Sequence, residues 1–282
     1  MQLTDHKTIR EIFSKNGFSF KKSLGQNFLV NPSVCPKMAE SAVSNGEEAV
    51  IEIGPGIGVL TVELAKCAKN VVSIEVDERL KPVLNETLAG YDNVEVIFGD
   101  CMKLDLAEII ESRFKGKKVS VCANLPYYIT SPIIMKLLDS RLPITSITVM
   151  VQKEAAERIC AKVGSRESGA VTVAVNYYSQ PKVLFNVSRG SFMPPPNVDS
   201  SVISLSISTE PCIEINNEKL FFEFVRAAFG QRRKTLVNSV GSLGKWSKEN
   251  VKSALISAGL SETVRAESLS MDELSSVFGY LD

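Results

Sequence analysis

The segment Asn124-Leu125-Pro126-Tyr127 brings together an amide, a proline and an aromatic ring. It follows an apolar, β-branched run at 119–123, which is typical of a buried strand. The Asn124 amide offers both a hydrogen-bond acceptor and a donor, proline stiffens the turn, and the Tyr127 ring presents a flat face for stacking. The segment therefore suits a planar molecule with an exocyclic amine, such as adenine, although an ordinary strand-ending turn uses the same residue types.

A second candidate is the glycine-rich segment Glu52-Ile53-Gly54-Pro55-Gly56-Ile57-Gly58, between an expected strand at 49–53 and an expected helix at 59–68. Glycine lets the backbone approach a ligand closely, and the amino end of a helix favours polar or anionic groups. A dinucleotide fingerprint requires a third glycine at position 59, where this chain has Val59. A nicotinamide or flavin dinucleotide is therefore disfavoured.

Two acids follow the next two expected strands. Glu75 ends the strand at 71–75, and Asp100 follows the strand at 94–98. A carboxylate can accept hydrogen bonds from ribose hydroxyls, and a carboxylate or its adjoining backbone can read the amine edge of adenine. Each acid alone would more often be a surface residue. Because parallel strands end at one edge of a sheet, we expect one nucleoside-shaped pocket with a second planar group beside it.

The elements that must position these residues alternate between strand and helix. Strands are expected at 49–53, 71–75, 94–98, 119–123 and 147–151, and helices at 59–68, 78–88, 106–114, 132–138 and 153–162. This rhythm predicts a mostly parallel sheet with helices on both faces. Strands at 182–187 and 200–206 should add an antiparallel edge, with the non-helical loop 191–197 between them. The apolar run at 170–178 fits either a helix or a strand.

Helical patterns flank this core at both ends of the chain. The first lie at 7–14 and 32–42, the latter with Pro32 in the first turn. A boundary is expected near Thr209-Glu210-Pro211, followed by helices at 218–228, 231–240, 248–258 and 271–281. The last helix should begin with a capping box from Ser270 to Glu273.

Composition limits the class of protein. With 44% hydrophobic and 23% charged residues, the chain is typical of a globular domain. It contains no run long enough to span a membrane, and its start does not look like a signal peptide. With 6 scattered cysteines and one histidine, His6, we expect reduced thiols in a cytoplasmic protein and no metal site.

Charge is neutral overall but unevenly distributed. Two segments, 12–38 and 226–248, carry several lysines or arginines and no acid. Such runs are commonly solvated helix faces. Because they lie near opposite ends of a neutral chain, we nevertheless predict a phosphate-binding surface. The candidate phosphate contacts are Lys21, Lys22, Arg232, Arg233 and Lys234.

Five segments together resemble the ribosomal RNA adenine dimethyltransferase family, most closely its bacterial small-subunit members. They are 23–29, 52–58, 124–127, 192–200 and 229–236, and the resemblance covers nearly the whole chain. It implies an α/β fold, with a Rossmann-like class I methyltransferase sheet and a small all-α C-terminal domain. The methyltransferase domain would span 1–209, including an N-terminal helical extension at 1–48. Residues 210–282 would form a helical domain that recognises RNA or the ribosome.

The resemblance also implies a role for individual residues around S-adenosyl-L-methionine and a target adenine. Asn27 and Leu29 would line the cofactor pocket. Gly54 would approach the methionine end of the cofactor, Glu75 would hold its ribose, and Asp100 its adenine amine. Asn124 would lie where cofactor and target base meet, and would accept hydrogen bonds from the target amine together with the Leu125 carbonyl. Tyr127 and Phe192 would enclose the flipped target adenine.

The implied substrate is a pair of adjacent adenosines in the 3′-terminal hairpin loop of 16S rRNA, dimethylated at N6 within the small (30S) ribosomal subunit. We expect a monomer with a role in ribosome biogenesis. Two alternatives stay open: a 23S rRNA adenine N6-methyltransferase of the antibiotic-resistance type, and a non-catalytic assembly or RNA-binding factor with the same fold. A nicotinamide oxidoreductase ranks third because of Val59.

Overall fold

The computed structural model describes residues 2–17, 27–43, 48–242 and 245–282. The chain forms two compact units. One comprises Met1–Ala156 and Lys182–Ile207, and the other comprises Glu157–Pro181 and Ser208–Asp282. Residues 157–181 therefore group with the carboxy-terminal helices, although residues 182–207 that follow them return to the first unit.

The first unit is built on a seven-stranded sheet with the order β4-β3-β2-β5-β6-β9-β7. The five strands from β2 to β6 are parallel to their neighbours, and β9 pairs antiparallel with β6. This confirms the predicted mixed α/β sheet with an antiparallel edge. The strands are β2 (Ala49–Ile53), β3 (Asn70–Glu75), β4 (Val94–Phe98), β5 (Val119–Asn124), β6 (Ile144–Gln152), β7 (Ser179–Val187) and β9 (Ser200–Ile207).

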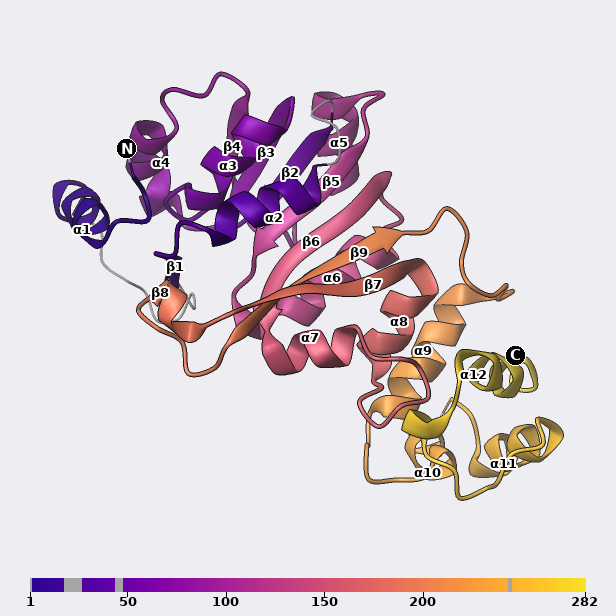
Figure 1. Ribbon diagram of the computed structural model, residues 1–282. Helices are drawn as coiled ribbons and strands as arrows, with labels where there is room; N and C mark the ends of the chain where they lie inside the picture. Colours follow the sequence, from indigo (N-terminus) through magenta and orange to yellow (C-terminus); the bar gives the residue numbers. More distant parts are fainter. Residues whose placement is uncertain (1, 18–26, 44–47, 243–244) are drawn as a thin grey trace. The chain divides into compact units, whose positions relative to one another are not determined.

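Helices connect these strands and cover the sheet, with α2 in front of it and α6 behind it in Figure 1. Those described in the first unit are α1 (His6–Lys15), α2 (Val34–Ala42), α3 (Val59–Cys67), α4 (Lys81–Thr87), α5 (Leu106–Phe114) and α6 (Thr130–Asp139), and α7 (Lys153–Ile159) leads into the second unit. The predicted start of α2 at Pro32 was wrong. The helix begins at Val34, because the Asn31 side chain accepts hydrogen bonds from Ser33 and closes a turn there.

A two-stranded pairing, absent from the sequence prediction, joins distant parts of the first unit. Strand β1 (Phe28–Leu29) pairs antiparallel with β8 (Phe192–Met193), so that Leu29 lies opposite Phe192. Both residues are buried in one core cluster with α2 and α3. Two-residue strands carry no recognisable periodicity, which explains why pattern reasoning could not find them.

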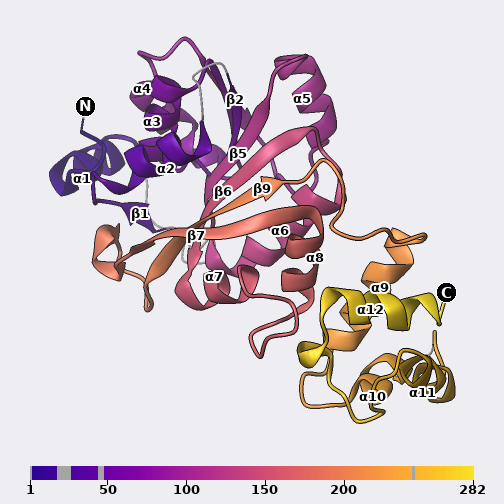
Figure 2. The same cartoon turned by 45° about the vertical axis from the view of Figure 1, so that its right-hand side comes forward.

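The second unit is helical, with α8 (Ala170–Tyr178), α9 (Glu218–Phe229), α10 (Leu236–Gly241), α11 (Lys248–Ser257) and α12 (Met271–Gly279) (Figure 2). The ambiguous run at 170–178 is thus a helix. The predicted helix start at Gln231 was wrong, because Thr235 caps α10 through the Asn238 N–H. The predicted capping box of Ser270 and Glu273 is confirmed.

No helix among the described residues is both long enough and apolar enough to cross a lipid bilayer.

Candidate active site

A cavity of about 250 Å³ lies at the carboxyl ends of β2, β3 and β5 in the first unit. Its lining comes from segments that are far apart in the sequence. All nine residues predicted for the cofactor and the target base line it: Asn27, Leu29, Gly54, Glu75, Asp100, Asn124, Leu125, Tyr127 and Phe192. The parallel register of the strands brings Gly54, Glu75, Asp100 and Asn124 together, because these strands end at one edge of the sheet. Leu29 and Phe192 reach the cavity through the β1–β8 pairing.

The glycine-rich turn after β2 forms the floor of the cavity. Gly54, Gly56 and Gly58 have φ angles of 74°, 59° and 88°. These values lie in the left-handed region, where other residues are strained. A Cβ atom at Gly54 would meet nothing within 4 Å, whereas one at Gly56 would lie 3.2 Å from the Phe28 ring. Gly54 therefore leaves open space in the cavity, and Gly56 allows the Phe28 ring to pack closely.

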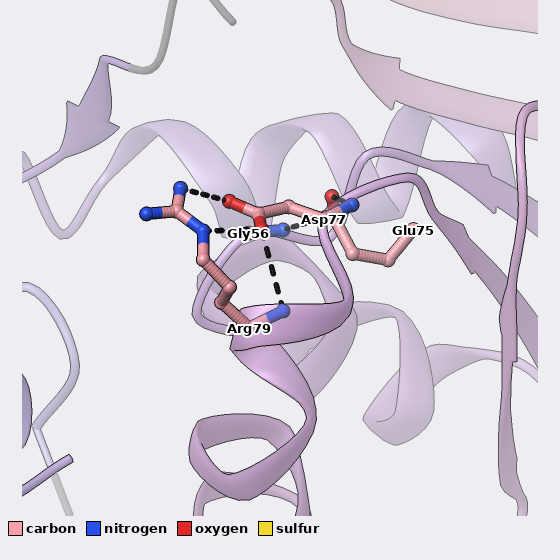
Figure 3. Close-up of polar contacts among 4 residues, drawn as sticks. All are labelled: Gly56, Glu75, Asp77 and Arg79. Carbon is pink, nitrogen blue, oxygen red and sulfur yellow. Dashed lines mark hydrogen bonds and ion pairs between the residues drawn. The ribbon is translucent and has the colours of Figure 1, made fainter. Parts of the chain in front are cut away.

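Glu75, at the end of β3, is only 5% exposed. Its Oε2 accepts from the Gly56 N–H at 3.1 Å, and its Oε1 accepts from the Asp77 N–H at 2.8 Å (Figure 3). Burial raises the pKa of Glu75, and these two donors partly oppose the shift. Each oxygen retains lone pairs for a further donor, so the carboxylate can also bind hydroxyl groups in the cavity.

Asp77, whose N–H donates to Glu75, is itself held in place by an ion pair. It is 6% exposed, and its carboxylate binds the Arg79 guanidinium through two charge-assisted hydrogen bonds of 2.8 and 2.6 Å (Figure 3). The bidentate geometry fixes Asp77. Its backbone N–H thus keeps a constant orientation toward Glu75.

Asp100 also lines the cavity and lies two residues beyond the end of β4 at Phe98. Its Oδ1 accepts from the Met102 N–H at 2.9 Å, and its Oδ2 lies 3.9 Å from Lys103 Nζ. The side chain is 35% exposed. The carboxylate is thus oriented by its own turn and still accessible from the cavity.

Asn124 is the last residue of β5 and pairs in register with Met150 of β6. Within the described ranges, no hydrogen bond engages its side-chain amide. Leu125 follows, with its N–H donating to the Met150 carbonyl at 3.4 Å. This bond and the fixed φ of Pro126 hold the turn, so the amide and the Leu125 backbone are presented to the cavity in a defined orientation.

Two aromatic rings form the walls beside Asn124. The Tyr127 hydroxyl lies 2.8 Å from the Ser200 hydroxyl, at the start of β9. Burial raises the pKa of Tyr127, which keeps the phenol neutral. Phe192 is 4% exposed and is held in place by the β1–β8 pairing. Both rings line the cavity although they are 65 positions apart in the sequence, a juxtaposition that the Pro-rich loop alone did not reveal.

Among the lining residues that sequence reasoning missed, two are exposed. Val76, directly after Glu75, is 56% exposed, and Tyr128, directly after Tyr127, is 63% exposed. Large apolar or aromatic side chains that are exposed at a cavity suggest contact with a ligand. The only signal in the sequence was their position next to predicted site residues.

Glu52, the first residue of the glycine-rich motif, lies outside this lining. It is fully buried and accepts a 2.6 Å hydrogen bond from the Ser73 hydroxyl. Burial raises the pKa of Glu52 to about 7. The carboxyl therefore belongs to the interior of the sheet and α3 rather than to the cavity surface.

The predicted phosphate-binding residues lie elsewhere. Arg232, Arg233 and Lys234 are exposed in the second unit, in the turn before α10. The Arg232 guanidinium donates to the Arg166 carbonyl at 2.9 Å. Lys21 and Lys22 fall outside the described residues. Across the part of the chain that is described, no group of three or more metal-ligating side chains could hold a metal ion.

The fold and the site together define a Rossmann-like methyltransferase, and comparison with solved structures agrees. A dimethyladenosine transferase from Plasmodium falciparum is 29% identical with a TM-score of 0.70, and covers 89% of this chain and 95% of its own. The 23S rRNA methyltransferase ErmE is 28% identical with a TM-score of 0.66, and covers 91% of this chain and 100% of its own.

Sequence comparison narrows this class. Residues 17–282 match the family model described as ribosomal RNA adenine dimethylase, so the chain belongs to that family. Relatives named ribosomal RNA small subunit methyltransferase A include one from Bacillus pumilus, which is 47% identical over 94% of this chain and 92% of its own length. Another, from Clostridioides difficile, is 44% identical over 97% of this chain and 95% of its own length.

Proposed function

We propose that this chain transfers methyl groups from S-adenosyl-L-methionine to N6 of two adjacent adenosines in the 3′-terminal hairpin loop of 16S rRNA, within the small ribosomal subunit. The observation that carries the proposal is the position of the Asn124 amide. It lines one cavity with the carboxylates of Glu75 and Asp100 and with the rings of Tyr127 and Phe192.

The residues around the cavity fit the proposed cofactor. The open space at Gly54 leaves room for a ligand against the backbone. Glu75 keeps lone pairs free for ribose hydroxyls, Asp100 is accessible to an adenine amine, and the exposed Val76 adds an apolar surface to the cavity lining. Asn27 and Leu29 close the cavity from the amino-terminal side. When bound, S-adenosylmethionine supplies a methyl group on a positively charged sulfur, which is already an activated electrophile.

The protein's part in catalysis is to orient the target amine. The lone pair of an adenine amine is delocalised into the ring, which makes the nitrogen a weak nucleophile. The Asn124 side-chain oxygen and the Leu125 carbonyl accept hydrogen bonds from the two amine hydrogens and favour a pyramidal nitrogen. Tyr127 and Phe192 hold the base between their faces. Such positioning and polarisation need no general base, and the product proton passes to water.

The target base must leave its helix or loop stack to enter the cavity. Bases in a hairpin loop are already partly unstacked, so the cost of flipping is small. The exposed Arg232, Arg233 and Lys234 would bind phosphates and let the helical unit select the substrate. On this proposal, residues 1–209 carry the chemistry, residues 210–282 recognise RNA, and the chain acts as a cytoplasmic monomer in ribosome biogenesis.

Two alternative functions are a 23S rRNA adenine N6-methyltransferase and a non-catalytic RNA-binding factor. A 23S rRNA adenine N6-methyltransferase is supported by the similarity to ErmE, but the relatives named for the small subunit are more similar, at 44% to 48% identity. A non-catalytic RNA-binding factor would not require the retained carboxylates and amide of the cavity.

The decisive experiment is labelled methyl transfer to small subunits that lack this modification, followed by mapping of the methylated bases. Two dimethylated adjacent adenosines in the hairpin loop are expected. Methylation of naked 23S rRNA but not of small subunits would favour the ErmE-like function. Absence of S-adenosylmethionine binding in calorimetry would favour the non-catalytic factor.

A further inference from the structure

Tyr128 lines the cavity with an exposed side chain that has no role in the proposed methyl transfer. It stands in the 3₁₀ turn Tyr127–Ile129, whose Ile129 N–H donates to the Pro126 carbonyl at 3.1 Å. Successive side chains of a 3₁₀ turn point about 120° apart. Tyr127 is directed inward to Ser200 at 2.8 Å, and Tyr128 is left 63% exposed while still lining the cavity.

Nothing in the described ranges holds the Tyr128 side chain in place. No ring contact, hydrogen bond or ion pair engages it there, whereas most of the other tyrosines and phenylalanines that the structure describes are buried. Tyr128 is the most exposed of the large apolar side chains in the described residues. An aromatic ring that is left in water beside a binding cavity loses little by stacking on a ligand, because it has no internal contact to give up.

We propose that Tyr128 is a stacking platform for the unpaired base next to the flipped adenosine. This inference rests on the proposed function. A base bound between Tyr127 and Phe192 fixes the backbone on either side of it, so a neighbouring nucleotide lies at the mouth of the same cavity. Aromatic side chains bind unpaired bases there without sequence preference, since every base has a π-face.

The proposal has a consequence for a loop with two adjacent target adenosines. While one adenosine occupies the cavity, the other is the neighbouring base and stacks on Tyr128. Tyr128 thereby positions the strand and raises affinity for RNA with consecutive unpaired bases. It does not contact the reacting nitrogen and is a positioning residue rather than a catalytic one.

The first test separates binding from turnover with Tyr128→Ala, Tyr128→Phe and the control Val183→Ala, all in the full chain. Val183 is also an exposed apolar residue of the first unit, 41% exposed, and does not line the cavity. With small subunits as substrate, Tyr128→Ala should raise KM roughly tenfold and leave kcat near wild type. Tyr128→Phe and Val183→Ala should behave like wild type. An unchanged KM for Tyr128→Ala, or equal damage by Tyr128→Phe, overturns the proposal.

The second test identifies the partner of the ring. Binding is measured by fluorescence anisotropy for the isolated hairpin and for two versions in which one or the other loop adenosine is abasic. Tyr128→Ala should weaken binding of the intact hairpin roughly tenfold, and this penalty should vanish on an RNA that lacks the neighbouring base. Equal penalties on all three RNAs overturn the proposal.

Two controls keep this inference separate from the proposed function. The Kd of S-adenosylmethionine should be the same for Tyr128→Ala and wild type, and a weakened Kd would make Tyr128 a cofactor contact instead. If the wild-type chain methylates no RNA, the proposed function itself fails. If the wild-type chain methylates adenosines and the Tyr128→Ala variant has the same KM and RNA affinity, only the stacking role is refuted.

Discussion

The hydroxyl of Tyr127 lies 2.8 Å from the hydroxyl of Ser200 and joins the turn after β5 to the first residue of β9. The two residues are 73 positions apart in the chain. Ser200 is fully buried, so it is a fixed partner. The orientation of the ring beside Asn124 therefore depends on a strand that follows the Pro-rich loop.

Removing either hydroxyl should loosen the Tyr127 ring without removing it. We expect Tyr127→Phe and Ser200→Ala each to lower kcat/KM roughly threefold to tenfold, which corresponds to the loss of one hydrogen bond. Because the two hydroxyls act as a pair, the double variant should be no worse than the worse single variant. Steady-state kinetics on unmethylated small subunits measure kcat/KM for each variant. If the loss in the double variant equals the product of the two single losses, the two hydroxyls act independently and their contact does not orient the ring.

Asn124→Ala should remove the side-chain acceptor that orients the target amine. We expect kcat to fall at least about 100-fold, as for other preorganised polar groups, with RNA binding nearly intact because the base keeps both aromatic walls. Single-turnover transfer and filter binding measure the two effects. The melting temperature serves as a folding control, and near-normal turnover would refute the role given to Asn124.

Glu75→Gln keeps the shape of the side chain and removes its charge. Hydrogen bonds to a charged acceptor are stronger than neutral ones, so we expect the Kd of S-adenosylmethionine to rise roughly tenfold to 100-fold. Calorimetry measures this Kd.

The same residue predicts a pH dependence. Since burial raises the pKa of Glu75, the wild-type affinity should be complete above that raised pKa and decline as the pH falls through it. The Glu75→Gln variant should lack this decline. A pH profile shared by both chains would assign the dependence to another group.

Glu52 should make the folded state less stable as the pH rises. Its pKa is raised by burial from 4.5 to about 7, so between these values the folded chain holds a proton that the unfolded chain has lost. The free energy of unfolding should therefore fall across this window, by on the order of 3 kcal/mol in total, and level off above it.

Glu52→Gln should remove this slope. Urea unfolding of both chains from below pH 4.5 to above pH 7 tests it, because the variant should gain stability relative to wild type over that range only. Parallel stability curves would contradict the prediction.

Arg232 and Arg233 are expected to bind RNA phosphates. Replacing both by alanine should weaken RNA binding and reduce the slope of log K against log salt by about one per lost phosphate contact. Arg232 also donates to the Arg166 carbonyl, so Arg233→Ala alone is the cleaner variant. Binding titrations over a range of salt concentrations decide, and an unchanged slope would move the RNA surface elsewhere.

The sequence by itself determined the strands that carry the site and the residues at their ends. β2, β4 and α5 have the predicted bounds, and Glu75, Asp100 and Asn124 could be assigned to strand ends. This was possible because apolar β-branched runs and glycine-rich turns are local signals, and because parallel strands must end at one edge. Among the errors, α2 begins two residues later than predicted, after a turn closed by the Asn31 side chain, and α10 begins at Leu236, where the Thr235 side chain caps it. Strands β6 and β7 each begin three residues earlier than predicted.

Only the tertiary structure decided how the cavity is enclosed. The pairing of Leu29 with Phe192 and the hydrogen bond between Tyr127 and Ser200 join residues that are far apart in the sequence, so no local pattern predicts them. The exposure of Tyr128 likewise depends on the packing around its turn. The physical reason is that these contacts come from short pairings and single side-chain bonds, whose partners are chosen by packing of the whole sheet rather than by local propensity.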